Sequence, residues 1–123
     1  MEHKFYPPTT VVELLEFEVP PGEVDQFIEA DERVWTAYLS SCPGFLDKQE
    51  ESSGALLDER QVVCATVWWA SLELWKAIPQ SELDKVQEQF VRELEGKEFP
   101  ITKADAFQLR KAGGCSKTLS STK

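Results

Sequence analysis

One stretch, residues 62–78, limits the folds open to this chain more than any other. It begins with VVCATVWW, which is apolar at nearly every position and rich in β-branched and aromatic side chains. A run of this kind predicts a central strand that is covered on both faces. The chain then passes through Ser71 into a helix start that contains Trp75, so three of the four tryptophans fall between residues 68 and 75. Such aromatic density indicates a core, an interface or a ligand pocket.

The composition narrows the class of protein. A chain of 123 residues predicts one domain that can bury a core without disulfides or metal. Its net charge of −9 argues against nucleic acid and against an anionic membrane surface as partners. No apolar run approaches the roughly 20 residues that span a bilayer, and the N-terminus has no apolar signal core, so we expect a cytoplasmic protein. The three cysteines are widely spaced without a CxxC pair, which indicates a reducing compartment and no metal or other cofactor.

The order of predicted elements defines a fold. Strands are predicted over residues 10–19, 45–51, 62–69 and 102–110, with helices over 23–40, from 72 to Pro79, and from an N-cap at Ser81 to a C-cap at Gly96. This β-α-β-β-α-β order predicts an α+β, ferredoxin-like protomer whose helices pack on one face of an antiparallel sheet. We expect a single domain over residues 1–110 and a disordered tail over residues 111–123.

The first and third strands carry large apolar residues on both phases, although the helices can cover only one face of the sheet. On the first strand, one phase holds Val11, Leu15, Phe17 and Val19, and the other begins with Val12 and Leu14 before turning acidic. The second face of the sheet must therefore meet another surface. A second copy of the same sheet is the simplest answer, so the sequence predicts a homodimer.

Three short motifs resemble a known family. They are Pro21-Gly22 before the first helix, Pro43-Gly44-Phe45 before the second strand, and Trp69-Ala70-Ser71-Leu72-Glu73 after the third. Together they resemble the dimeric α+β barrel superfamily, which includes the antibiotic-biosynthesis-monooxygenase-like domains, and the FIEADERVWTAYL and SLELWKAIP stretches resemble a small branch of it. The resemblance implies two sheets that close into a barrel across a two-fold axis, with a pocket between sheet and helices in each protomer.

The resemblance does not extend to catalytic residues. The cofactor-free oxygenases and haem-degrading members of that superfamily use an asparagine, a tryptophan and often a histidine in the pocket. This sequence has no asparagine, and its one histidine, His3, lies ahead of the first strand. These departures count against a standard monooxygenase and against a haem-binding histidine.

Asp31 is the strongest candidate for chemistry, because it lies within an apolar helical stripe, four residues from both Phe27 and Trp35. A partly desolvated aspartate there is suited to general acid–base catalysis. The alternative is that Asp31 lies at the edge of the stripe and pairs with Arg33 of a second copy or with water.

Aromatic side chains are the candidates for binding a ligand. Trp68 and Trp69 should point to opposite faces of their strand, and Tyr38 adds a hydroxyl to the helical stripe. Core packing is the simpler interpretation for at least two of the tryptophans, and Glu16 either reaches a pocket mouth or is solvated. The predicted ligand-binding set is Trp35, Tyr38, Trp68, Trp69 and Trp75.

Two hypotheses for function follow. The first is a ligand-binding or non-catalytic protein that holds a small apolar organic molecule in a tryptophan-lined pocket. The second is a cofactor-independent monooxygenase or isomerase that acts on a small organic substrate with Asp31 as acid or base. The missing asparagine and pocket histidine favour the first, and the position of Asp31 favours the second.

Overall fold

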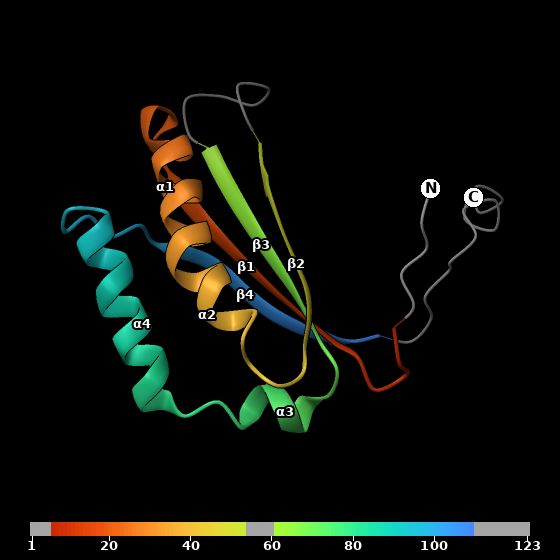
Figure 1. Cartoon of the computed structure of the whole chain (residues 1–123). Coiled ribbons are helices and arrows are strands. Elements are labelled where there is room, and N and C mark those ends of the chain that lie inside the picture. The colour runs from red at the N-terminus through yellow and green to blue at the C-terminus, as the bar shows by residue number, and fades with distance from the viewer. Residues whose placement is uncertain (1–5, 54–60, 110–123) are drawn as a thin grey trace, which may run out of the picture.

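The computed structural model describes residues 6–53 and 61–109, and the predicted α+β, ferredoxin-like fold is confirmed. A four-stranded antiparallel sheet has the order β2-β3-β1-β4, and the helices lie on one face of it (Figure 1). The elements are β1 (Val11–Val19), η1 (Pro21–Glu23), α1 (Val24–Asp31), η2 (Glu32–Thr36), α2 (Ala37–Leu39), β2 (Phe45–Ser52), β3 (Gln61–Trp69), α3 (Leu72–Lys76), α4 (Gln80–Glu93) and β4 (Ile101–Gln108).

Strand β3 is central, as its sequence predicts, and its side chains alternate between two environments. Val63, Val67 and Trp69 are buried against the helices, whereas Cys64 and Trp68 on the opposite phase are only half-buried. The protomer thus covers one face of β3 and leaves the other without a helix (Figure 1). Cys64 is therefore only half-buried, although it lies within the apolar run of the strand.

The first helical segment runs without a break through α1, η2 and α2, over residues 24–39, in agreement with the helix predicted from the sequence. Its middle part, η2, is a π-helix. Phe27 of α1 lies at the centre of the larger core cluster, where its ring contacts Phe17 of β1, Phe90 of α4 and Phe99 at centroid distances of 5.1, 5.5 and 5.4 Å. The apolar stripe of this segment therefore faces the sheet and α4.

Helix α4 begins two residues earlier than the sequence indicates, because its N-cap is Pro79 and not Ser81. The predicted cap at Ser81 is wrong, because α4 starts at Gln80 and the carbonyl of Pro79 already accepts hydrogen bonds from the backbone N–H groups of Glu82 (3.1 Å) and Leu83 (3.2 Å). Proline fixes its own φ and cannot continue α3, so the new helix starts directly after it. The predicted C-cap at Gly96 is wrong by two residues, because α4 ends at Glu93 and Leu94 is its C-cap. Gly96 lies two residues beyond that cap with a φ of 87°, and its N–H donates a hydrogen bond to the carbonyl of Val91 (2.8 Å), as in a Schellman motif.

Strand β4 is an edge strand that pairs with β1 and is exposed along its whole length. It ends at Gln108, two residues before the predicted end. His3, Cys115 and the predicted tail over residues 111–123 lie outside the described residues. Within the described ranges, no helix is long and apolar enough to cross a membrane.

Candidate functional site

A cavity of about 490 Å³ lies between the helix-facing side of the sheet and the helices. Leu15 of β1 with Ala65 and Val67 of β3 line it from the sheet, and Phe90 and Leu94 line it from the α4 side. Ala65 contributes only a methyl group where a core strand would usually place a larger side chain, which leaves space above the sheet. Most of the other lining side chains are apolar or aromatic, as in sites that bind small organic molecules.

Two charged side chains reach this wall from the sheet itself. Lys48 of β2 and Glu13 of β1 both pair with Val67 of β3, so the three residues form one row across the sheet. Paired residues of antiparallel strands project from the same face, and Val67 is buried towards the helices. Lys48 and Glu13 therefore flank Val67 inside the cavity, which both residues line.

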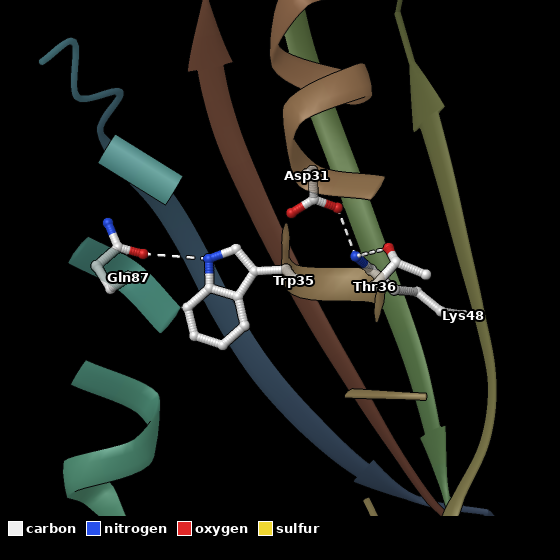
Figure 2. A network of polar contacts seen from close by, with 5 residues as sticks. All are labelled: Asp31, Trp35, Thr36, Lys48 and Gln87. Atoms are coloured by element: carbon white, nitrogen blue, oxygen red, sulfur yellow. Dashed lines mark hydrogen bonds and ion pairs between the residues drawn. The ribbon is translucent and has the colours of Figure 1, made fainter. Parts of the chain in front are cut away.

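Asp31 meets Lys48 from the helix side of the cavity. Its carboxylate Oδ2 forms a buried ion pair with Lys48 Nζ, and the same ammonium donates a hydrogen bond to Thr36 Oγ1 at 2.7 Å (Figure 2). The alternative that Asp31 lies at the edge of the stripe is wrong, because Asp31 is buried and pairs with Lys48 of the same chain. Arg33 instead forms an exposed ion pair with Glu93 of α4 at 2.9 Å.

The π-helical segment η2 explains how two helix residues reach one lysine. Residues four apart share a face of an α-helix, but residues five apart diverge. In a π-helix the hydrogen bonds close over five residues, so Thr36 comes onto the side of Asp31. Trp35, between them, points the other way, and its indole Nε1 donates to Gln87 Oε1 of α4 at 3.2 Å (Figure 2).

Glu50 of β2 adds a second acid beside Asp31. It pairs with Ala65 of β3, so its side chain shares the helix-facing side of the sheet with Lys48. Burial, followed by a hydrogen bond to Asp31 and the charge of that carboxylate, raises the pKa of Glu50 to about 9. Glu50 is therefore protonated at neutral pH and can donate its proton to Asp31. Its Oε2 is buried without a hydrogen-bond partner among the described residues.

Glu13 is the acid of β1 that reaches the cavity. Its Oε1 accepts a hydrogen bond from Trp69 Nε1 at 3.1 Å, and burial raises its pKa above the ordinary value of 4.5. The sequence left Glu16 either at a pocket mouth or solvated; it lies on the opposite phase of β1, where it pairs with Cys64 and is not part of the cavity lining. Glu13 lies between Val11 and Leu15 on the same phase of the strand, and this position in the sequence predicts that its side chain faces the helices.

The structure separates the predicted site residues into two groups. Asp31, Trp35, Trp69 and Trp75 line the cavity, whereas Trp68 and Tyr38 are not part of its lining. Trp68 stacks on Tyr6 on the far face of the sheet, with centroids 6.1 Å apart. The Tyr38 hydroxyl donates to Glu82 Oε1 at 3.2 Å, and partial burial with the neighbouring Cys42 and Glu82 raises its pKa to about 12, which keeps the hydroxyl protonated. A role for any of these residues in ligand binding stays a prediction.

The comparisons with known proteins rest on structure. No protein-family model matches the sequence, and no curated protein matches it. SnoaB, a cofactor-independent oxygenase from Streptomyces nogalater, is 17% identical with a TM-score of 0.58, over 85% of this chain and 96% of its own. A monooxygenase from the gene ActVA-Orf6 of Streptomyces coelicolor, solved in complex with the ligand nanaomycin D, is 21% identical with a TM-score of 0.59, over 86% and 92%.

A third solved structure, proposed to be an antibiotic biosynthesis monooxygenase from Chloroflexus aurantiacus J-10-fl, is 17% identical with a TM-score of 0.58, over 84% of this chain and 95% of its own. In all three cases the likeness covers nearly the whole of the solved chain. At these identities it establishes the fold and leaves the activity open. The chain therefore has the fold of the antibiotic-biosynthesis-monooxygenase-like proteins, as its sequence motifs indicate.

Proposed function

We propose that this protein binds a small, largely apolar organic molecule in the cavity between sheet and helices. The observation that carries the proposal is the 490 Å³ cavity itself, whose apolar and aromatic wall contains a few fixed polar groups. A cavity of this size and lining suits a ligand of a few fused or linked rings. The nanaomycin D complex of the ActVA-Orf6 protein supports the idea that this fold accommodates such a molecule.

A cavity-filling substitution tests the proposal. Ala65 lines the cavity, whereas Ala37 of α2 is exposed and lies outside it, so Ala65→Phe and Ala37→Phe make the same chemical change in two environments. We expect the apolar dye Nile red to gain fluorescence with the wild type and with Ala37→Phe, and to lose this gain with Ala65→Phe. An equal gain with both variants would place the dye outside the cavity and contradict the proposal.

Catalysis without a cofactor is the second candidate function. It is favoured by the burial of Asp31 on the cavity wall and by the description of SnoaB as a cofactor-independent oxygenase. In this hypothesis Asp31 exchanges a proton with the bound molecule. Because Asp31 is already bound to Lys48, the lysine would hold the carboxylate in position. Asp31→Asn should then abolish turnover of a candidate substrate by the protein that remains folded, although it also leaves Lys48 without its partner. Unchanged turnover would remove Asp31 from the mechanism.

We also propose that two copies associate through the uncovered face of the sheet. Phe107 of β4, Val12 of β1 and Trp68 of β3 form one apolar row across that face, since Val12 pairs with both of the others. Phe107 is 54% exposed in the protomer. An aromatic row of this kind is costly to leave in water, and a two-fold related copy of the same row would cover it.

A further inference from the structure

The side chains that line the cavity include more acids than bases. Its two lysines are both engaged with carboxylates, Lys48 with Asp31 and Lys97 with Glu23 at 3.2 Å. Glu13 and Glu98 also line the cavity, and neither forms an ion pair among the described residues. Among the described residues that line the cavity, an incoming molecule therefore meets unpaired acids but no unpaired lysine, and Lys76 lies outside the lining, over the ring of Trp75.

Glu13 is the better placed of these two acids. Trp69, which is fully buried, donates its indole N–H to Glu13 Oε1 at 3.1 Å, and the ring of Phe45 packs edge-on against Trp69 at 6.1 Å. This arrangement fixes the orientation of the carboxylate before any ligand arrives. Its Oε2 has no hydrogen-bond partner among the described residues. The neighbours of Glu13 on the adjacent strands, Val67 and Ala106, offer no donor from their side chains.

We propose that the cavity selects apolar molecules that carry an amine, and that Glu13 binds the ammonium group of such a ligand. The inference rests on the proposed function, because it names the ligand class of the same cavity. An ammonium donates to the free carboxylate oxygen, and tryptophan ring faces nearby attract cations. Trp75 on the cavity wall already holds one, since Lys76 Nζ lies 4.5 Å from its ring centroid. An anionic ligand would instead meet an unpaired carboxylate and be rejected.

Three probes with one ring system separate charge from shape: naphthylethylamine, naphthylethanol and naphthylacetate. For the wild type we expect the amine to bind about tenfold tighter than the alcohol, because only the ammonium adds a charge opposite to that of the carboxylate, and the acetate to bind most weakly. In Glu13→Gln the amide oxygen still accepts from Trp69, but the preference for the amine should disappear. Glu16→Gln makes the same change on the other face of β1 and should keep the preference.

The pH dependence provides a test that needs no variant. Lys48 from β2 and Lys76 from α3 are the cations that act on Glu13, and burial outweighs both, so its pKa is raised. Because its pKa is raised, Glu13 becomes neutral at a higher pH than an ordinary glutamate, while the amine stays charged. Affinity for naphthylethylamine should therefore fall in acid, and affinity for naphthylethanol should not.

The outcomes distinguish this inference from the function on which it rests. Equal binding of the amine and the acetate, or an amine preference that survives in Glu13→Gln, would overturn the inference and leave the apolar cavity as a binding site. Failure of all three probes to bind the wild type would contradict both the inference and the proposed function.

Discussion

Asp31 and Lys48 form a buried ion pair that joins the first helical segment to strand β2. Their side chains are only 7% and 5% exposed. The pair forms part of the cavity wall, and Thr36 supplies the lysine with a second oxygen. Removing one member of a buried pair leaves the other charge without compensation, which costs more than the pair itself contributes.

Replacing Lys48 should therefore destabilise the protein strongly. We expect Lys48→Met to lower the free energy of unfolding by about 3–5 kcal/mol, and Asp31→Asn in the same chain to recover much of that loss. Lys103→Met is the control, because Lys103 forms an exposed ion pair with Asp105 at 3.9 Å, and such pairs contribute at most about 1 kcal/mol. Urea unfolding measures all four proteins. Equal losses for the two lysine variants would show that the Lys48 pair is not buried.

Glu50 should make stability depend on pH. The folded protein holds the Glu50 proton up to about pH 9, whereas the unfolded chain releases it near 4.5. The stability that this proton provides is complete below 4.5 and is lost as the pH rises through 9. We expect Glu50→Gln to unfold with a flatter pH profile than the wild type between these values. Glu51→Gln, which alters the neighbouring residue on the opposite phase of β2, should keep the wild-type profile, and identical profiles for both variants would refute the account.

Gly44 should not tolerate a side chain. Its φ is 92°, and a Cβ built there would lie 2.6 Å from the Cβ of Leu74 in α3. The positive φ alone costs about 1–3 kcal/mol for a residue other than glycine. We expect Gly44→Ala to lower the unfolding midpoint clearly, and Gly22→Ala to change it little, because nothing lies within 4 Å of a Cβ at Gly22. An unchanged unfolding midpoint in Gly44→Ala would contradict the close contact between Leu74 of α3 and Gly44.

Phe107 should control the association of two copies. Placing a carboxylate in the apolar row of the uncovered sheet face would bury an unpaired charge in the proposed interface. We expect Phe107→Asp to be a monomer by light scattering coupled to size-exclusion chromatography at concentrations where the wild type is a dimer. Leu72→Asp serves as the control, because Leu72 is a similarly exposed apolar residue on α3. A wild-type monomer, or a dimer that survives in Phe107→Asp, would rule out this interface.

The fold could be predicted from the sequence because local patterns determine it. The apolar, β-branched run over residues 62–69 predicts a central strand, and β3 lies between β2 and β1 in the sheet. Pro79 stands directly before the last helix because it cannot continue α3, and Gly96 lies in the turn that follows the C-cap at Leu94 because it tolerates a positive φ. The fully apolar run predicts cover on both faces of β3, whereas helices cover only one of them in the protomer (Figure 1).

The candidate site was only partly accessible from sequence. Asp31 was found because a charge within an apolar stripe is unusual, but its partner was not. Lys48 and Glu50 lie on a mostly polar strand, so no pattern marks them as buried. Their meeting with Asp31 depends on strand register, and the contact of Thr36 with Lys48 depends on the π-helical segment over residues 32–36. The local sequence specifies neither feature. Glu13 was missed because only the apolar members of its strand phase were considered.

Native mass spectrometry of the freshly purified protein tests the central claim, a cavity that holds a small organic molecule, most directly. The account predicts a small adduct that is retained under native conditions, lost on unfolding, absent from Ala65→Phe and present in Ala37→Phe. An adduct retained equally by both variants would place the bound molecule outside the cavity. A protein that carries no adduct and does not bind Nile red would contradict the claim itself.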